Sequence, residues 1–468
     1  MSSNNINKLF DDYRALSDTT IRINESKKIE FIEACKNAFN KKENWTFWLP
    51  LVTSLNLCVK CATCAEVCPV YLASNKNPLY HPVRRSDILR KVYNRLTKYS
   101  GKLISLFNNN IITEEEINAL AESVYRCTVC RKCAYVCPIG VDNGLISRET
   151  RKIFTQIGVV PDELYDNGTI LQKRFGNATK LPNKAFLNIL NSIKEEIKDY
   201  KGIDVEIPIN KEGADYLILN NSGDYMAFME TIIGQVEILN AAKLDWTYND
   251  IIDIDNDSNK ITNDVVAYGL FFSDKELVDI AKSHLALVKK LKPKTLVIGE
   301  CGHAYEVQKY IYRDILPEWK DVNVISILEL FNELINSGKI KVDPKKNSER
   351  VVYHDSCKMG RLGGLYNEPR NILRAVCSDF TELNPCKEMS VCCGGGGGLA
   401  LMSKNDFLKF RMETYGKIKR DQLIESRANT IALACSNCKA QFRDIINYYH
   451  LDVEFKGISE IISNALVY

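Results

Sequence analysis

The chain has 468 residues, of which 45% are hydrophobic, and 62 Lys and Arg residues nearly balance 59 Asp and Glu residues. This length and apolar content exclude a disordered tail. The net charge of +3 does not fit the basic surface of a nucleic-acid-binding protein, so we expect no nucleic-acid partner. No apolar run has the length of a signal peptide or a membrane span, so we expect a soluble, cytoplasmic protein.

Apolar side chains recur at helical spacing through most of the first third of the chain. The predicted helical segments are Ile29–Phe39, Asp87–Leu106 and Leu145–Ile157. Thr113 followed by Glu116 forms a capping-box pattern at the start of a further helix. A polar connector is predicted from Pro161, with the turn residues Asp166–Gly168 inside it.

From about residue 213 short apolar runs alternate with helical ones, which predicts parallel strands covered by helices. The predicted strands are Tyr216–Leu219, Val265–Leu270, Thr295–Ile298, Val322–Ile325, Arg350–Tyr353 and Thr430–Ala434. A weak internal repeat relates the two halves of this region. The matched pairs are Asn220–Ser222 with His354–Cys357, Ala267–Gly269 with Cys392–Gly394, and Thr295–His303 with Thr430–Cys438. We therefore predict a duplicated α/β unit.

The count that stands out is 17 cysteines, because cytoplasmic thiols that cluster are typical of metal or redox sites. Two runs share the spacing Cys-x2-Cys-x2-Cys-x3-Cys-Pro: Cys58, Cys61, Cys64 and Cys68, and Cys127, Cys130, Cys133 and Cys137. This is the run of bacterial ferredoxins, in which the fourth cysteine of each run binds the other cluster. We expect two cubane [4Fe-4S] clusters, held by Cys58, Cys61, Cys64 and Cys137, and by Cys127, Cys130, Cys133 and Cys68. Structural zinc, which uses two Cys-x2-Cys pairs, is a poor match.

A third set of five cysteines lies in the second half of the repeat: Cys357, Cys392, Cys393, Cys435 and Cys438. They converge if each follows the end of a parallel strand. Gly394–Gly398 follows the adjacent pair, and we expect these glycines to let the backbone approach a cluster closely. A dinucleotide fingerprint over Gly395–Ala400 and a merely flexible loop are the alternatives.

This third set resembles the CCG domain of heterodisulfide reductases. Together with Gly299–His303 and Pro82–Tyr93, it narrows the resemblance to DsrK-type iron–sulfur subunits of sulfite-reductase-linked membrane complexes and their menaquinol-linked and transmembrane-redox-complex relatives. The resemblance covers residues from about 45 to 460. It implies a noncubane [4Fe-4S] cluster on the five cysteines, with Gly394 and His354 beside it, and no flavin or nicotinamide in this chain.

The resemblance also implies a function, that of an oxidoreductase that reduces a disulfide or trisulfide at the noncubane cluster. Electrons would come from a membrane quinol through a haem b, DsrM-like subunit that holds the chain at the cytoplasmic face. The substrate would be a DsrC-type sulfur-carrier protein or a small-molecule disulfide. The alternatives are an electron-relay subunit of a lactate or glycerol-3-phosphate oxidase, and a coenzyme M–coenzyme B heterodisulfide reductase. The first half of the repeat lacks four of the five cysteines, which disfavours the latter.

Three residues take the place of the missing thiols in the first half of the repeat: Glu300, Cys301 and His303. We expect a pocket there, in which a near-neutral His303 beside Glu300 donates protons to the sulfur leaving groups. Cys301 is a candidate sixth ligand or exchanging thiol. The competing interpretation is that Glu300 and His303 only satisfy each other in a remodelled core.

The remaining histidines and cysteines have no ligand spacing. They are His81, His284 and His450, and Cys35, Cys377 and Cys386, of which the cysteines are expected to be small buried apolar residues. The predicted fold is α+β and multidomain, an α-helical two-cluster ferredoxin domain followed by a duplicated α/β CCG-type domain. The expected segments are a helical extension (1–50), the ferredoxin domain (51–160), a connector (161–212), a degenerate first CCG-like unit (213–345) and a second unit with the noncubane cluster (346–468).

Overall fold

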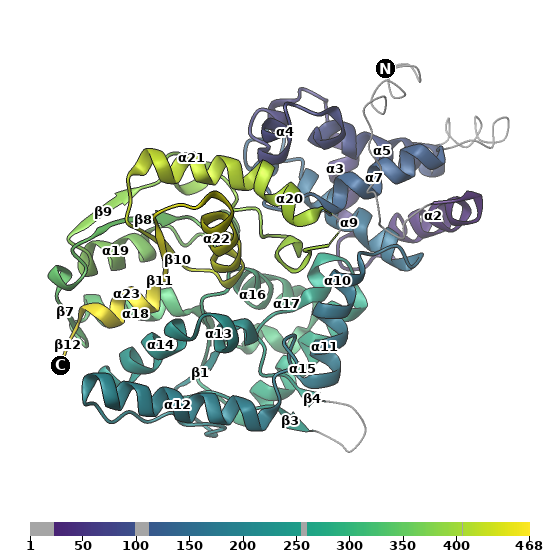
Figure 1. Cartoon of the computed structure of the whole chain (residues 1–468). Coiled ribbons are helices and arrows are strands. Elements are labelled where there is room, and N and C mark those ends of the chain that lie inside the picture. Colours follow the sequence, from purple (N-terminus) through teal and green to yellow (C-terminus); the bar gives the residue numbers. More distant parts are fainter. Residues whose placement is uncertain (1–22, 99–111, 254–259, 405) are drawn as a thin grey trace. The chain divides into compact units, whose positions relative to one another are not determined.

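The computed structural model describes residues 23–98, 112–253, 260–404 and 406–468. The chain forms two compact units (Figure 1). Unit 1 contains the described residues of Met1–Tyr165, Leu270–Asp274 and Gly394–Ile418, and unit 2 contains Asp166–Gly269, Lys275–Cys393 and Lys419–Tyr468. The expected extension before residue 23 and the end of the predicted helix after residue 98 lie outside the described ranges. No helix among the described residues combines the length and the apolar character that crossing a membrane requires.

Unit 1 is helical. Its helices are α2 (Glu25–Ala38), α3 (Trp48–Leu57), α4 (Pro69–Ala73), α5 (Pro82–Thr97), α7 (Glu114–Tyr125), α8 (Lys132–Tyr135), α9 (Asn143–Gln156), α10 (Asp162–Leu164) and α20 (Phe407–Arg411). The predicted capping box is confirmed, since Thr113 and Glu116 bond each other's backbone N–H groups at the start of α7. Helix α9 packs against α2, α3, α5 and α7, and is the centre of the unit.

The buried face of α9 carries charges that are paired within unit 1. Arg148 contacts Glu149 and Asp274 at 2.6 Å each, and Lys152 contacts Asp274 at 2.8 Å. The Nε of Arg148 also donates to the carbonyl of Leu270 at 2.9 Å. Burying charges is costly unless each is paired and hydrogen-bonded. The short return segment Leu270–Asp274 therefore completes the core of unit 1.

Unit 2 contains two four-stranded parallel sheets with related strand orders, β2-β1-β5-β6 and β11-β10-β8-β9. The first sheet consists of β1 (Tyr216–Leu219), β2 (Trp246–Thr247), β5 (Thr295–Ile298) and β6 (Val324–Ser326). The second consists of β8 (Arg350–His354), β9 (Asp379–Glu382), β10 (Thr430–Leu433) and β11 (Glu454–Gly457). Two small antiparallel ladders pair β3 (Ile252–Asp253) with β4 (Lys260–Ile261), and β7 (Lys341–Val342) with β12 (Leu466–Val467).

The helices of unit 2 connect these strands. They are α11 (Leu171–Phe175), α12 (Asn183–Lys201), α13 (Ser222–Ala227), α14 (Met229–Ala241), α15 (Asp274–Leu291), α16 (Gly302–Glu306), α17 (Tyr312–Ile315), α18 (Ile327–Asn336), α19 (Asn367–Val376), α21 (Lys417–Ser426), α22 (Ser436–Tyr449) and α23 (Ile458–Ala465). Helix α14 packs on α23, and α18 packs on α19. The contact between α14 and α23 is close, since a side chain at Gly234 would lie 2.5 Å from the carbonyl oxygen of Ser459.

The sheet topology confirms the duplication predicted from the sequence. We call residues 213–345 copy one and residues 346–468 copy two. Strands β1, β2, β5 and β6 correspond to β8, β9, β10 and β11, and the two helix contacts, α14 with α23 and α19 with α18, exchange under this correspondence. The chain also enters unit 1 after Gly269 in copy one and after Cys393 in copy two, next to the segments that the sequence repeat aligned.

Two predicted elements are wrong. Val265–Leu270 is not a strand: Tyr268–Phe271 forms a 3-10 turn, and side chains satisfy the backbone before it. Gln308 and Gln172 donate to the carbonyls of Val265 and Val266, so this apolar run needs no neighbouring strand. The expected turn at Asp166–Gly168 lies within a π-helical segment, Tyr165–Ile170, between α10 and α11.

Candidate functional site

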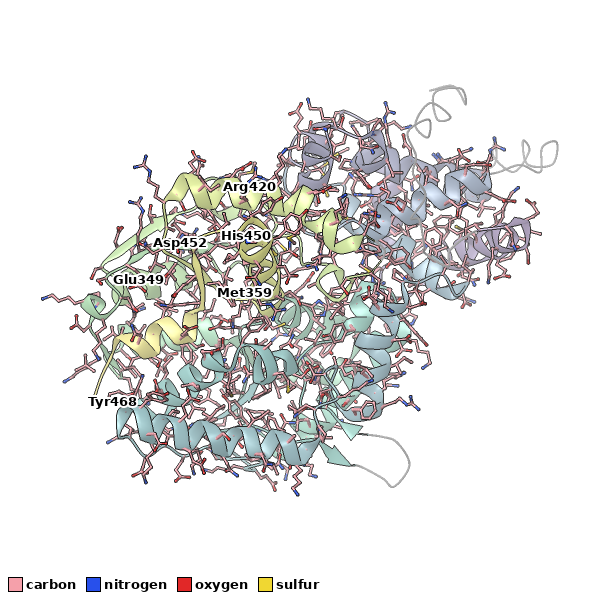
Figure 2. All side chains as sticks on the ribbon, viewed as in Figure 1. Glu349, Met359, Arg420, His450, Asp452 and Tyr468 are labelled. Carbon is pink, nitrogen blue, oxygen red and sulfur yellow. The ribbon has the colours of Figure 1, made fainter. Side chains whose placement is uncertain are left out.

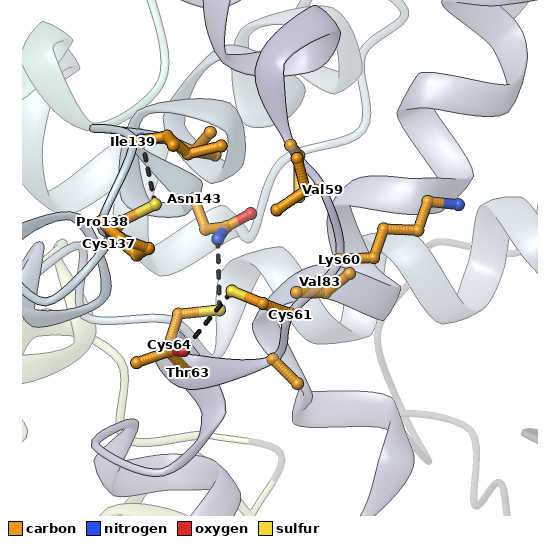
Figure 3. Close-up of a pocket in the computed structure, with 13 residues that line it drawn as sticks. Val59, Lys60, Cys61, Thr63, Cys64, Val83, Cys137, Pro138, Ile139 and Asn143 are labelled. Carbon is orange, nitrogen blue, oxygen red and sulfur yellow. Dashed lines mark hydrogen bonds between the residues drawn. The ribbon is translucent and has the colours of Figure 1, made fainter.

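The first thiol set of unit 1 lines a pocket (Figure 3). Cys58, Cys61 and Cys64 come from the loop after α3, and Cys137 comes from the loop after α8. Two polar groups point at the sulfur atoms: the side-chain amide of Asn143 lies 3.6 Å from Cys64 Sγ, and the N–H of Val141 donates to Cys137 Sγ at 3.3 Å. The structure thus brings together the four thiols expected around the first cluster.

The second thiol set is buried beside an unpaired cation. Burial raises the pKa of Cys133 well above its usual value, and the neighbouring Cys130, Cys127 and Cys68 raise it further, which places these four thiols together. Arg85 is 3% exposed, and its Nε and Nη1 have no hydrogen-bond partner. Burial opposes its charge, yet the thiolates of this set raise its pKa overall.

The two cysteine loops share an uncommon backbone conformation. Lys60 and Ala62 flank the second cysteine of the first loop with φ of 61° and 66°, and Val129 and Arg131 flank that of the second loop with φ of 52° and 57°. Non-glycine residues rarely adopt this left-handed region, least of all a β-branched valine. Such strain at equivalent positions turns each loop around one centre. The chemistry of eight thiols, an unpaired buried guanidinium and backbone N–H donors fits two anionic [4Fe-4S] clusters.

Part of the glycine run Gly394–Gly398 packs within unit 1 on the second cysteine loop. A side chain at Gly396 would lie 2.9 Å from the carbonyl oxygen of Thr128, and one at Gly397 would lie 3.0 Å from that of Cys127. Arg151 donates to the carbonyls of both Gly397 (2.6 Å) and Cys127 (2.7 Å). The glycines therefore permit a close backbone approach, as expected, and the alternative of a merely flexible loop is wrong.

The third thiol set lies in unit 2, at the carboxyl ends of the strands of copy two. Cys357 follows β8, Cys392 and Cys393 follow β9, and Cys435 and Cys438 follow β10 at the start of α22. All five are buried, none more than 6% exposed. Cys393 Sγ and Cys438 Sγ are 3.3 Å apart. No disulfide joins any of the 17 cysteines, all of which lie in the described ranges. The sequence prediction that these five thiols converge agrees with this arrangement.

Polar groups from both copies surround Cys435. Hydrogen bonds from the Cys438 thiol, from the backbone N–H groups of Cys438 and Gly302 and from the Ser356 hydroxyl hold the pKa of Cys435 below its usual value, despite burial. Gly302 is in copy one, and a side chain there would collide with Ser356 at 2.8 Å. The loop after Cys357, which includes Met359 (labelled in Figure 2), also packs against this glycine. Copy one thus contributes directly to the thiol site.

Two further groups at this site were missed from the sequence. Lys419 in α21 is 1% exposed, and burial lowers its pKa to about 8 against the opposing effect of the Cys393, Cys392 and Cys438 thiolates. Asp355 forms a bidentate ion pair with Arg370, with both N–O distances at 2.8 Å, which fixes the loop that leads to Cys357. Arg85 was missed too, although its spacing from Ile88, Leu89 and Val92 places it on the apolar face of α5, where a charge is a usable signal. No comparable signal marks Lys419.

The expected pairing of Glu300 with His303 is wrong. Glu300 bonds Lys439 Nζ at 2.7 Å and accepts from the backbone N–H and hydroxyl of Ser459 at 2.7 and 2.6 Å. His303 Nε2 lies 3.0 Å from the carbonyl oxygen of Ala267 instead. Burial lowers the pKa of His303 to about 4, so the expectation of a near-neutral histidine is also wrong. Both residues and Cys301 are at most 2% exposed, so the structure shows packed side chains where a pocket was expected.

Cys301 stays beside the third thiol set. Burial raises its pKa well above the usual value, and the proximity of Cys435 adds to that rise. Ser436, next to Cys435, donates its backbone N–H and its hydroxyl to the carbonyl of Glu300 at 2.8 and 2.9 Å, and its hydroxyl also lies 2.8 Å from Asp224. These contacts join the strand-end loops of the two copies.

The residues without ligand spacing lie apart from the three thiol sets. Cys35 and Cys377 are buried, as expected, but Cys386 is only half-buried, which corrects the prediction. His284 bonds the hydroxyl of Tyr312 and the carbonyl of Asp264. His81 stacks edge-on against Tyr71, and His450 (labelled in Figure 2) ends α22.

Comparison with known proteins agrees with these sites. A family described as "4Fe-4S dicluster domain" matches residues 54–141, and one described as "Cysteine-rich domain" (CCG) matches residues 351–443. The chain is 27% identical to an Hdr-like menaquinol oxidoreductase iron-sulfur subunit 2 of Archaeoglobus fulgidus, over 96% of this chain and 85% of that protein. It is 25% identical to one subunit of the dihydromethanophenazine:CoB–CoM heterodisulfide reductase of Methanosarcina acetivorans, over 88% of this chain and 94% of that protein.

A further similar protein is the EtfAB:quinone oxidoreductase of Syntrophomonas wolfei, which is 24% identical over 90% of this chain and 59% of that protein. These relatives are oxidoreductases, several of them subunits of redox complexes, and the chain shares their two cysteine-rich regions. The chain therefore belongs to the CCG-domain superfamily of iron–sulfur oxidoreductase subunits that includes the HdrD-type chains of heterodisulfide reductases.

Proposed function

We propose that this chain is the iron–sulfur subunit of a membrane-linked complex of the DsrK type, and that it reduces a disulfide or trisulfide at the third thiol set. The observation that carries the proposal is the convergence of five buried thiols at the strand ends of copy two, with Lys419 beside them. Cubane clusters on the two thiol sets of unit 1 and a noncubane [4Fe-4S] cluster on the third would supply electrons one at a time.

The reaction consumes protons as well as electrons. A disulfide R–S–S–R takes up two electrons and two protons and gives two thiols R–SH. A trisulfide R–S–S–S–R takes up four electrons and four protons and gives two thiols and H2S. The cation of Lys419 stabilises negative charge on sulfur beside Cys392 and Cys393, because opposite charges interact strongly where water is excluded. The ion pair of Asp355 with Arg370 keeps the Cys357 loop in place.

The names of the relatives support the choice of partners. One relative is named for menaquinol oxidation and another for reduction of the CoB–CoM heterodisulfide. We accordingly propose a quinol-oxidising, haem b membrane partner of the DsrM type, a location at the cytoplasmic face, and a DsrC-type carrier protein as the sulfur substrate. Copy one lacks the thiols for a second noncubane cluster, which favours this substrate over a coenzyme heterodisulfide.

Electron paramagnetic resonance of the oxidised, iron-loaded protein tests the proposal. We expect about twelve iron atoms per chain and a paramagnetic signal that changes when a thiol is added. With a reduced viologen as electron donor, the protein should release thiols from a DsrC-type carrier in its trisulfide form. The variant Cys377→Ser, which removes a buried thiol outside the three sets, is the control and should behave as the wild type.

A second candidate function is electron relay without a sulfur substrate. The burial of all five thiols, at most 6% exposed, favours it, and so does the similarity to the EtfAB:quinone oxidoreductase. The same experiment separates the two functions. Full iron loading with no response to thiols and no release of thiols from the carrier would contradict sulfur reduction and leave the relay.

A further inference from the structure

His354, the last residue of β8, is buried without a hydrogen-bond partner on either ring nitrogen. It is 1% exposed, and neither Nδ1 nor Nε2 has a partner. The other two buried histidines of the described part of unit 2 contrast with it: both nitrogens of His284 are bonded, and His303 Nε2 lies 3.0 Å from a carbonyl oxygen. An unsatisfied buried polar group is costly, so such a group in a native core calls for a ligand.

The ring of His354 faces the third thiol set. One ring nitrogen, Cys393 Sγ and Cys438 Sγ all lie within 4.8 Å of one another, a spacing at which one metal ion can bind all three. The ring packs edge-on against Phe442 of α22, with 5.0 Å between centroids, and this contact fixes its orientation. The nitrogen and the two sulfurs come from three different segments, so the fold itself creates the cluster.

The protonation state of His354 suits a metal ligand. Burial lowers its pKa well below the usual value, and the cations of Lys419 and Arg361 lower it further, while Asp355 opposes them. The ring is therefore neutral, with a lone pair available to a metal. Imidazole nitrogen and thiolate sulfur occur together as iron ligands in Rieske centres, where imidazole in place of thiolate raises the reduction potential.

We propose that His354 binds one iron of the third cluster through a ring nitrogen, at the position shared with Cys393 and Cys438. The inference rests on the proposed function in that it requires a cluster at this site. It adds a nitrogen ligand to the five thiolates, so that one iron carries a neutral ligand in place of a negative one. The reduced, more negative form of the cluster is thereby stabilised.

Pulsed electron paramagnetic resonance of the thiol-responsive signal tests this ligand. The iron-loaded protein is compared with and without 15N-labelled histidine. We expect hyperfine coupling from a directly bound nitrogen that changes with the label, disappears in His354→Cys, and persists in the control His303→Gln. The His354→Cys variant supplies a thiolate in place of the imidazole, so it keeps the iron and shifts the midpoint potential of this cluster to a more negative value.

The outcomes separate this proposal from the proposed function. A thiol-responsive signal without nitrogen coupling, or coupling that survives in His354→Cys, overturns the ligation by His354 and leaves the proposed function standing. Iron at about eight atoms per chain without a thiol-responsive signal contradicts the proposed function and the His354 site together. Coupling that is lost in His303→Gln and kept in His354→Cys would assign the nitrogen to copy one.

Discussion

The two copies of the α/β unit have the same strand order and equivalent helix contacts, yet their strand ends carry different chemistry. In copy two, β8, β9 and β10 lead to thiols, whereas in copy one β5 leads to Glu300. That carboxylate is paired with Lys439, the residue after Cys438, and with Ser459 of α23. Copy one therefore holds in place the helix that carries two of the thiols, and does so with charges instead of metal ligands.

The buried polar groups at this junction are almost all shared between the copies. Ser436 bonds Asp224 and the carbonyl of Glu300, and Lys439 contacts Thr231 at 2.6 Å as well as Glu300. Burial raises the pKa of Asp224 to about 7 against the opposing effect of Lys439. The difference between the copies teaches that a metal site and a polar network can occupy equivalent places in one fold, the first for chemistry and the second for stability.

The largest expected effect comes from Cys435→Ser, which removes a thiol of copy two. We expect loss of the third cluster and a decrease in thiol release from a trisulfide of at least ~100-fold, because a hydroxyl replaces a thiolate that iron binds. Iron content should fall from about twelve to about eight atoms per chain. An unchanged iron content would show that Cys435 is not a ligand.

The converse change, Glu300→Gln in copy one, should cost stability and leave the clusters in place. It removes the charge opposite Lys439, which is 1% exposed, so we expect the free energy of unfolding to fall by about 3–5 kcal/mol in chemical denaturation. The control is Asp245→Asn, which breaks the exposed pair with Lys211 and should cost less than ~1 kcal/mol. Equal losses in the two variants would remove the stabilising role assigned to copy one.

The interior of copy one also predicts a dependence of stability on pH. Burial lowers the pKa of His284 to about 4 from its ordinary value of 6.5. Between these pH values the unfolded chain binds a proton that the folded chain does not, so this contribution to stability is complete above pH 6.5 and is lost as pH falls toward 4. The slope is at most about 1.4 kcal/mol per pH unit.

Denaturation curves of the wild type and His284→Gln from pH 7 to 4 measure this term. The variant is expected to be less stable at pH 7, because the bonds to Tyr312 and Asp264 are altered, and its unfolding free energy should fall less on acidification. Parallel pH profiles for the two proteins would mean that His284 is not the group responsible.

The smallest effect concerns the glycines that follow Cys393. Gly397 and Gly338 both have positive φ, 64° and 70°, but only Gly397 has backbone within 4 Å of an added side chain. Alanine at Gly338 should cost ~1 kcal/mol from its conformation alone. Alanine at Gly397 should cost about 1–2 kcal/mol more, because it also meets Cys127. Equal unfolding free energies for the two variants would contradict the close approach.

The sequence predicted the strands best where they are short, apolar and buried. Tyr216–Leu219 and Thr295–Ile298 match β1 and β5, and the cysteine spacing placed all three thiol sets. The repeat was detectable because strand-end residues keep their spacing even where their chemistry differs. These features depend on local pattern and composition, which a sequence displays directly.

The parts that failed depend on contacts between residues far apart in the chain. Val265–Leu270 has the composition of a strand, but Gln172 and Gln308, distant in sequence, satisfy its carbonyls. The pairing of Glu300 with His303 was expected from their closeness in sequence, whereas Lys439 is the actual partner of Glu300. Neighbouring positions on a loop say little about which buried groups pair, since side chains three residues apart can point to different segments.

The return segments of unit 1 have a consequence for how the chain can be divided. A fragment ending at Tyr165 would contain both ferredoxin cysteine runs but would lack Asp274, the partner of Arg148 and Lys152, and Gly397, the acceptor of Arg151. Three cations of α9 would then be buried or exposed without their counterparts. The electron-carrying half is thus not a transplantable module, and a gene fusion or truncation must retain the chain through Ile418 to keep it folded.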